Sequence, residues 1–186
     1  MKRALIIGGT SGIGKALAFE LDKRGWLVEA VGSKKIDLSW PTSWWEWKRH
    51  QVDKFDLVVF SAGYLNPEPW DKKTWGEYFK SYAINAIGPV YFLAVEEDII
   101  KEDATIVFIS SVGAINEGAN DLGYGMSKAA LEKAAKALNA NTSYDVRLIR
   151  FDLVDTPMMH KQPEESFEGR EVLTAKEAAL QIVKLL

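Results

Sequence analysis

The chain contains no cysteine among its 186 residues, so it forms neither disulfides nor thiolate metal sites. Its two histidines, His50 and His160, lack the spacing of metal ligands, and no metal site is expected. No apolar run approaches the roughly 18 residues that a membrane-spanning helix needs. The first residues lead directly into a short strand pattern without the apolar segment of a signal peptide, so we expect a cytoplasmic protein.

An excess of charge of one sign is also lacking. The 23 basic and 26 acidic residues leave a formal net charge of -3 at pH 7. Such a balance offers no general attraction to nucleic acid or to an anionic membrane surface, so we expect neither as a partner. The length and the hydrophobic content of 47% are those of one globular domain, which we place at residues 1–186.

Short apolar strands alternate with longer helical patterns along the chain. This alternation predicts an α/β fold with a doubly wound, Rossmann-type parallel sheet between two layers of helices. The runs at 56–61 and 105–110 are apolar throughout, as expected where helices cover both faces of a sheet. Six strands are expected at 2–7, 26–31, 36–38, 56–61, 105–110 and 146–151, and helices at 13–24, 39–52, 74–97, 124–138 and 174–186.

A glycine cluster lies between the first strand and the first helix. Glycine lets the backbone approach a pyrophosphate closely, and the N-terminus of the following helix offers free N–H groups. Glycines at a strand–helix turn also occur for purely steric reasons, so the cluster alone is weak evidence. Its spacing differs from the usual Gly-x-Gly-x-x-Gly, but its position between strand and helix predicts a dinucleotide-binding turn made of Gly8, Thr10, Ser11, Gly12, Ile13 and Gly14.

The end of the second strand bears on the choice between the two nicotinamide cofactors. An acidic residue there would bond a ribose 2′-hydroxyl, whereas basic or small polar groups admit a 2′-phosphate. Here Gly32-Ser33-Lys34-Lys35 follows the strand, with no carboxylate at that place. Ser33 and Lys34 therefore favour NADP(H) over NAD(H). The alternative is that the two lysines form an ordinary solvated turn.

Four polar residues form a candidate acid/base site. Tyr124 and Lys128 are four residues apart, which places both side chains on one face of a helix. A tyrosine has an unperturbed pKa of about 10, and a neighbouring ammonium lowers that pKa toward neutrality. Ser111 would donate a hydrogen bond to a substrate oxygen, and Asn85 would hold a water behind Lys128 as a proton route. The Tyr–Lys spacing alone is common in helices without function.

Taken together, these motifs resemble those of the short-chain dehydrogenase/reductase family. The glycine turn, the Asn85-Ala86-Ile87-Gly88 segment, Ser111 and the Tyr124–Lys128 pair match the family's motifs in order along the chain. The resemblance implies a carbonyl–alcohol oxidoreductase, in which the lysine also binds the nicotinamide ribose. It further implies that the cofactor contacts Asp37, Leu38, Ala62, Gly63, Val154 and Thr156.

The chain departs from the family pattern in three places. Only three residues separate Ser33 from Asp37, where family members usually carry a whole helix. Phe151-Asp152 replaces the usual Pro-Gly, and the family's last strand is not expected after the terminal helix. A short substrate loop is expected at about 156–172. The resemblance therefore predicts a reduced six-stranded sheet with a more open site.

The resemblance also bears on partners. The family's usual tetramer is in doubt without the last strand, but a homodimer through the helices at 74–97 and 124–140 is compatible with the sequence. Alanines on the second helix would permit close helix packing, although alanine is also simply a good helix former. The expected small-molecule partner is a carbonyl or alcohol substrate. Its pocket would be lined by the loops at 64–70, 114–123 and 158–167.

Two other functions remain open at this point. One is a nucleotide-binding sensor or scaffold that keeps the fold without turnover, which the trimmed sheet favours and the complete set of four polar residues disfavours. The other is a sugar-nucleotide epimerase or dehydratase. Those proteins carry a sizeable C-terminal substrate domain, whereas only about thirty residues follow Thr156 here. An NADPH-dependent carbonyl reductase is the preferred interpretation.

Overall fold

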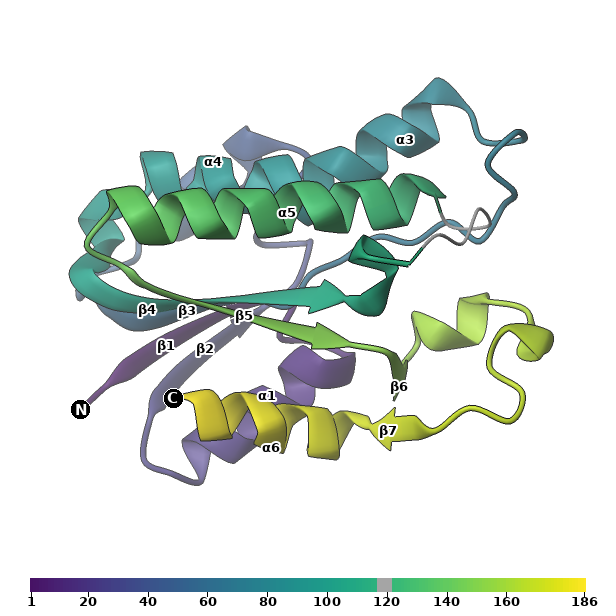
Figure 1. Ribbon diagram of the computed structural model, residues 1–186. Coiled ribbons are helices and arrows are strands. Elements are labelled where there is room, and N and C mark those ends of the chain that lie inside the picture. Colours follow the sequence, from purple (N-terminus) through teal and green to yellow (C-terminus); the bar gives the residue numbers. More distant parts are fainter. Residues whose placement is uncertain (117–121) are drawn as a thin grey trace.

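The protein is described by a computed structural model that covers residues 1–116 and 122–186. A parallel five-stranded sheet lies between two layers of helices (Figure 1). The strands follow the order β2-β1-β3-β4-β5, so the chain starts near the middle of the sheet and winds outward in both directions. This arrangement confirms the expected doubly wound α/β fold. The strands are β1 (Arg3–Ile7), β2 (Leu27–Val31), β3 (Phe55–Phe60), β4 (Ile100–Ser111) and β5 (Asp145–Phe151).

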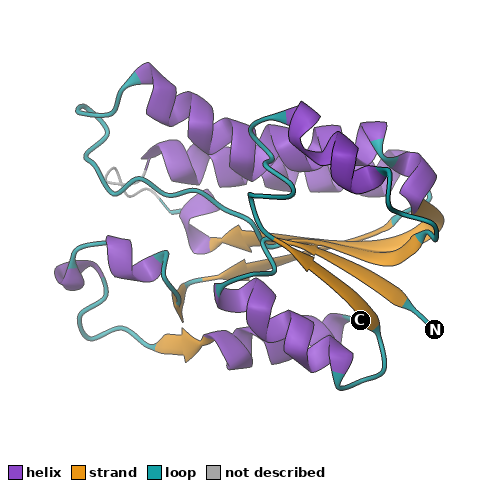
Figure 2. Ribbon diagram, turned by 180° about the vertical axis from the view of Figure 1, so that it is seen from behind, coloured by secondary structure: helices purple, strands orange, loops and turns teal. Residues whose placement is uncertain are grey.

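Helices cover both faces of the sheet, as the view from behind also shows (Figure 2). One face carries α2 (Trp45–Lys48), α3 (Trp75–Tyr82), α4 (Gly88–Val95) and α5 (Leu122–Asn141). The other carries α1 (Gly12–Asp22) and α6 (Ala175–Leu185), which pack against each other. A smaller parallel pair, β6 (Leu153–Asp155) and β7 (Val172–Thr174), was not predicted and leads into α6. Within the described residues, no helix is long and apolar enough to span a membrane.

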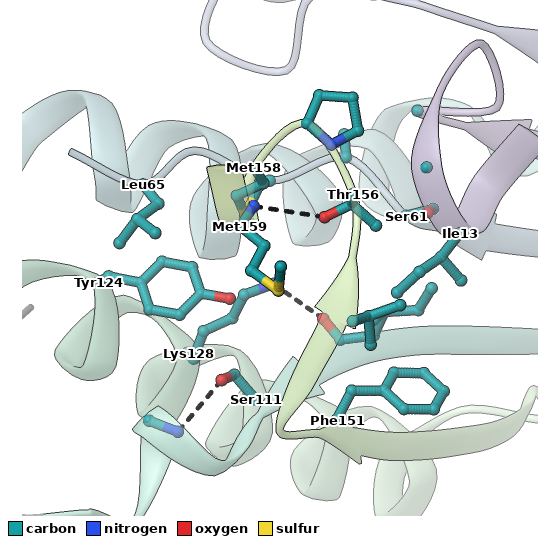
Figure 3. A pocket seen from close by; sticks show the side chains of 18 of the residues that line it. Ile13, Ser61, Leu65, Ser111, Tyr124, Lys128, Phe151, Thr156, Met158 and Met159 are labelled. Carbon is teal, nitrogen blue, oxygen red and sulfur yellow. Dashed lines mark hydrogen bonds between the residues drawn. The ribbon is translucent and has the colours of Figure 1, made fainter. Parts of the chain in front are cut away.

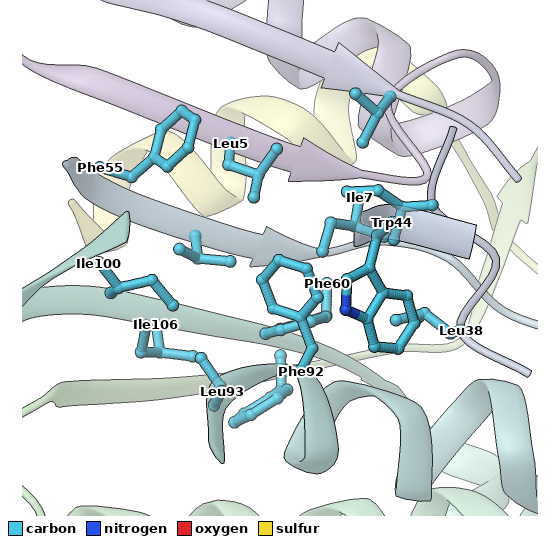
Figure 4. Packing of buried hydrophobic residues seen from close by; sticks show 14 of the residues in the cluster. Leu5, Ile7, Leu38, Trp44, Phe55, Phe60, Phe92, Leu93, Ile100 and Ile106 are labelled. Atoms are coloured by element: carbon cyan, nitrogen blue, oxygen red, sulfur yellow. The ribbon is translucent and has the colours of Figure 1, made fainter. Parts of the chain in front are cut away.

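The core is divided between the two faces of the sheet because side chains alternate along each strand. On β1, Leu5 and Ile7 belong to the cluster under α4 and α5, where Phe60 stacks on Phe108 and meets Phe92 edge-on (Figure 4). The intervening Ala4 and Ile6 face α1 and α6. All the β1 side chains from Ala4 to Ile7 are fully buried, as expected for a central strand of a doubly covered sheet.

The strand expected at 36–38 does not form. A parallel neighbour of β2 would need a crossover of about a dozen residues, and only four separate the end of β2 from Ile36. The chain instead turns tightly, with the N–H groups of Lys35 and Ile36 both donating to the carbonyl of Gly32. Ile36 and Leu38 are nevertheless buried, and the Leu38 carbonyl lies directly against Gly88 at the start of α4.

The prediction of a helix at 39–52 is also largely wrong. The segment forms a 3-10 turn at Pro41–Trp44 followed by the single helical turn of α2. Tertiary contacts hold it instead: the Trp44 indole N–H donates to buried Glu96 at 2.8 Å, and the Lys48 ammonium lies 2.8 Å from the same carboxylate. Trp44 and Trp47 are buried while their neighbours Trp40 and Trp45 are exposed. Two of the four tryptophans thus pack in the core and two lie on the surface.

The long helix expected at 74–97 is interrupted at its centre. A π turn at Ala83–Ile87 separates α3 from α4. Pro89 supplies the physical reason, because proline has no N–H to continue the regular helical hydrogen bonding. The widened turn contains Asn85, whose side chain is thereby placed behind Gly63, a residue that lines the cavity described next.

Candidate active site

A cavity of about 940 Å³ opens where the carboxyl ends of all five sheet strands meet (Figure 3). This is the edge at which doubly wound sheets place their ligands. Fifteen of the predicted site residues line it: Gly8, Thr10, Ser11, Gly12, Ile13, Ser33, Asp37, Leu38, Ala62, Gly63, Ser111, Tyr124, Lys128, Val154 and Thr156. Gly14, Lys34 and Asn85 are not among the lining residues. The predicted pocket loop at 114–123 includes residues 117–121, which lie outside the described residues.

The glycine turn between β1 and α1 has the geometry of an anion cradle. Gly8 and Gly12 have φ angles of +87° and +50°, which side chains other than hydrogen rarely tolerate. A Cβ on Gly14 would lie 2.4 Å from the Gly8 carbonyl oxygen, so the helix could not approach the turn with any larger residue. Gly14 therefore acts behind the cavity wall. The free N–H groups of the α1 N-terminus fit the pyrophosphate of a dinucleotide.

Lys128 is held in the cavity wall by a hydrogen bond to the backbone of β4. Its ammonium donates to the Ile109 carbonyl on β4 at 2.8 Å, and the residue is 4% exposed. Burial lowers the pKa of Lys128 to about 8, because removal from water disfavours the charged form. The ammonium lies 5.7 Å from the centroid of the Tyr124 ring. The two side chains thus share one helix face, as their spacing predicts.

Ser111 and Tyr124 face the cavity from β4 and α5. The Ser111 hydroxyl oxygen accepts a hydrogen bond from the Gly113 N–H at 3.1 Å. The Tyr124 ring lies beside the same turn, and a Cβ on Gly125 would lie 2.5 Å from the Gly113 carbonyl oxygen. The start of α5 therefore packs directly on the turn that follows Ser111. In Figure 3 the side chains of Ser111, Tyr124 and Lys128 point into the same space.

Asn85 is buried behind this group and binds three polar atoms. Its Oδ1 accepts from the Tyr64 N–H at 2.7 Å, and its Nδ2 donates to the Tyr64 carbonyl at 2.8 Å and to the Ser127 hydroxyl at 2.9 Å. The Ser127 hydroxyl in turn donates to the Tyr124 carbonyl at 2.7 Å. Asn85 therefore braces the backbone around the site. Its part in a water-mediated proton route stays a prediction.

The wall beneath the second strand carries the residues predicted to bind the adenosine half of a cofactor. Gly32 and Ser33 line the cavity, and a Cβ on Gly32 would lie 2.6 Å from the Thr10 hydroxyl. Lys34 is exposed beside this wall rather than part of it. The Asp37 carboxylate accepts from the backbone N–H and the hydroxyl of Ser39, so the aspartate shapes its own turn.

The segment after β5 closes the cavity from the opposite side. Val154 is buried, and the Thr156 methyl would lie 3.1 Å from a Cβ on Gly12, so this segment lies against the glycine turn. The exposed Asp152 and Arg170 form an ion pair at the cavity rim, which joins the residue after β5 to the last part of the expected substrate loop. The pairing of Asp152 with Arg170 was not predicted.

A second set of polar contacts, also missed by the sequence reasoning, joins α5 to the sheet. Glu132 lies one turn after Lys128 and is 7% exposed. Its carboxylate accepts from the Ser110 hydroxyl at 2.8 Å and from Arg150 at 2.6 and 2.5 Å. Its spacing of four residues from Lys128 indicated that the two side chains share one face of the helix. Nothing local in the sequence indicated Arg150 as its partner.

The sequence is similar to a protein-family model and to curated proteins. The family model described as enoyl-(acyl carrier protein) reductase matches residues 42–183. A tropinone reductase homolog from Arabidopsis thaliana is 26% identical over 169 residues, which cover 76% of this chain and 64% of that protein. The chain spans 64% and 62% of the lengths of the two curated relatives that it matches.

Solved structures share the fold at low sequence identity. A small-chain dehydrogenase in complex with NADPH superposes with a TM-score of 0.84 at 19% identity, covering 99% of this chain and 90% of that chain. A 3-ketoacyl-(acyl-carrier-protein) reductase from Brucella melitensis complexed with NADH gives 0.82 at 20% identity, with the same coverage. These likenesses show the arrangement of strands and helices.

We predict that the charge of Glu132 stabilises the fold in a pH-dependent way. Arg150 holds the pKa of this carboxyl below its usual value against the opposing effect of burial, and Ser110 adds to the shift. Glu132→Gln should therefore lower the free energy of unfolding by about 1–3 kcal/mol at pH 7. A carboxyl whose pKa is lower in the folded protein than in the unfolded chain stabilises the folded protein fully at pH values above the unfolded-chain pKa of about 4.3. That stabilisation is lost as the pH falls through the folded-state pKa.

Urea denaturation at pH 7 and at successively lower pH, down to the limit of the folded state, measures this effect. The difference between wild type and Glu132→Gln should shrink as wild type becomes protonated. Glu102→Gln, which removes an exposed carboxylate on β4, serves as the control and should change little. A difference that stays constant with pH would show that the charge of Glu132 is not its source.

Proposed function

The chain belongs to the short-chain dehydrogenase/reductase family, and on that premise we propose that it reduces a carbonyl group to an alcohol with NADPH. The observation that carries the proposal is the convergence of Ser111, Tyr124 and Lys128 on one cavity beside the glycine turn. A nicotinamide cofactor, when bound, supplies the hydride. The Gly8–Gly14 turn would hold its pyrophosphate, and Lys128 its ribose.

The chain's own residues would manage the proton and the oxygen. The Ser111 hydroxyl would donate a hydrogen bond to the carbonyl oxygen and so fix its position. The Tyr124 hydroxyl would donate the proton that this oxygen takes up on reduction. The buried ammonium of Lys128 would stabilise the phenolate left on Tyr124, because its charge acts at short range in a site with little water. Asn85 would keep the backbone around these groups in place.

A nucleotide-binding sensor of the same fold is the rival proposal. A protein that only binds a dinucleotide needs the glycine turn and the adenosine wall, but has no use for Ser111 and Tyr124 beside each other at the far end of the cavity. The presence of both supports an enzyme. The trimmed sheet, which favours the sensor, is the weaker indication, because a fold does not determine a function.

Replacing Tyr124 with Phe separates the two proposals. The ring and its packing are kept while the proton donor is lost, so kcat for reduction of a ketone should fall by at least about 100-fold. The dissociation constant for NADPH, measured by nucleotide fluorescence, should change by less than about three-fold because the variant keeps the cradle. Turnover within a few-fold of wild type would overturn the role of Tyr124. NADPH binding by wild type without reduction of any ketone or aldehyde would support the sensor.

We also propose that the cofactor is NADP(H) rather than NAD(H). Ser33 offers a hydroxyl at the cavity wall, and the exposed ammonium groups of Lys34 and Lys35 lie directly after it, with no carboxylate between the end of β2 and Lys35. A charge-assisted contact to a phosphate is stronger than a contact between neutral groups.

Replacing Lys34 and Lys35 together with Ala should weaken NADPH binding roughly tenfold or more, which corresponds to about 1.4 kcal/mol. NADH has no 2′-phosphate, so its dissociation constant should stay within about two-fold. Titration of both nucleotides against wild type and the double variant measures the difference. Equal losses for the two nucleotides would mean that the lysines do not contact a 2′-phosphate.

A homodimer through α3, α4 and α5 is a further proposal. The sequence from Ser81 to Val95 carries no charged residue, yet Ile87 and Tyr91 on this stretch are 56% and 45% exposed. A helix that is apolar on all sides is expected to be buried on all sides. Trp75 and Phe79 continue the exposed apolar surface along α3.

Replacing Ile87 and Tyr91 together with Lys should convert a dimer to a monomer, since two buried charges per subunit would have no partners at the interface. Size-exclusion chromatography with light scattering measures the mass. Phe19→Lys, at a similarly exposed apolar residue on α1 in the opposite layer, should leave the mass unchanged. A monomeric wild type, or a double variant that stays dimeric, would contradict the proposal.

A further inference from the structure

The loop at 64–70 has two different sides. Leu65, Pro67 and Pro69 line the cavity, whereas Tyr64 and Asn66 are turned to α3. The Tyr64 hydroxyl donates to the Glu77 carboxylate at 2.5 Å and the Asn66 amide donates to the same oxygen at 2.8 Å. Successive side chains thus alternate between α3 and the cavity, as in an extended chain, so one side of the loop is anchored and the other side is free to contact a ligand.

The anchored side leaves this loop little freedom. Both backbone polar groups of Tyr64 are bonded to the Asn85 side chain, and the Tyr78 hydroxyl donates to the Trp70 carbonyl at the other end of the loop. The two prolines fix their own φ angles. The apolar side chains of Leu65, Pro67 and Pro69 are thus presented as one preformed wall, and Leu65 is only 6% exposed.

The facing wall is apolar and adaptable. It comes from the segment after β6, where Met158, Met159 and Pro163 also line the cavity. A Cβ on Gly63 would lie 3.1 Å from the Met158 methyl carbon and 3.9 Å from the Lys128 ammonium. Figure 3 shows Leu65, Met158 and Met159 around Tyr124. Thioether side chains rearrange readily around apolar groups of different shape.

Charged groups are poorly placed to bind a charged substrate. Among the described residues that line the cavity, the charged side chains are Asp37, Lys128, Asp152 and Arg170. Asp37 lies on the adenosine side and bonds Ser39. Asp152 and Arg170 are paired with each other at the exposed rim. Lys128 is bonded to a backbone carbonyl deep in the wall, which leaves the two apolar walls without a cation for a carboxylate or phosphate.

From this arrangement we propose that the substrate is an uncharged, open-chain ketone or aldehyde whose aliphatic body lies between the Leu65–Pro67–Pro69 wall and the Met158–Met159 wall. The inference rests on the carbonyl reduction proposed above and names its substrate class. Each methylene that enters the slot is removed from water on both sides, so longer chains are reduced more efficiently until the slot is filled.

A series of methyl ketones measures this directly. With NADPH saturating, kcat/KM should rise by about four-fold per added methylene from 2-butanone to 2-hexanone, the factor that corresponds to about 0.8 kcal/mol. A 2-oxo carboxylate of the same chain length as 2-hexanone should be at least tenfold poorer than the ketone, because its carboxylate has no cation in the slot.

Variants of the rigid wall test where the selectivity resides. Leu65→Asn keeps the side-chain size but makes it polar, so the rise with chain length should flatten while kcat/KM for 2-butanone changes less than that for 2-hexanone. Leu27→Asn changes an exposed leucine at the start of β2, the opposite end of the sheet, and should leave the whole series unchanged. Pro67→Ser tests the same wall if Leu65→Asn does not fold.

The outcomes separate this inference from the function on which it rests. A flat series, or preference for the 2-oxo carboxylate, would overturn the aliphatic slot while leaving carbonyl reduction in place. A rise with chain length that neither wall variant reduces would place the slot elsewhere and overturn the assignment as well. If wild type binds NADPH but reduces no carbonyl compound, carbonyl reduction itself fails, and the substrate class fails with it.

Discussion

The bond from the Lys128 ammonium to the Ile109 carbonyl is the constraint on which the arrangement of the site depends. An ammonium removed from water is costly unless it is bonded, and on β4 the Ile109 carbonyl accepts its hydrogen bond. The bond sets the position of α5 along β4. Since Tyr124 lies one helical turn before Lys128 and Ser111 lies two residues after Ile109, the same bond brings the hydroxyls of both residues to one strand end.

A second contact repeats this attachment one turn further along. Glu132 on α5 binds Ser110, the residue next to Ile109, and is shared with Arg150 on β5. The helix is thus attached at two successive turns to two successive residues of one strand. At the start of α5, just before Lys128, the fit is steric, because Gly125 packs on the Gly113 carbonyl where no Cβ has room. Slippage of α5 along β4 would break all three contacts.

The sequence predicted those parts of the molecule that depend on local pattern. Apolar runs located the strands, and the polar residues after them met at one sheet edge because carboxyl ends of parallel strands must. The failures share a different cause. The segment at 36–48 is held by the contacts of Trp44 and Lys48 with Glu96, which is distant from both in the sequence, and its short reach from β2 excluded a sixth strand. The Glu132–Arg150 pair and the anchoring of the 64–70 loop likewise depend on distant partners that no local pattern reveals.

Asn85 connects the two halves of the site through a single amide. A side-chain amide offers two N–H donors and two acceptor positions. Both donors are used, on the Tyr64 carbonyl and the Ser127 hydroxyl, and one acceptor position takes the Tyr64 N–H. The Ser127 hydroxyl in turn donates to the Tyr124 carbonyl, and Tyr64 begins the loop that carries the apolar wall of the cavity. The proposed proton donor and the proposed substrate wall are therefore held at a fixed distance from each other. A change in one would shift the other, which ties the choice of substrate to the placement of the reacting hydroxyl.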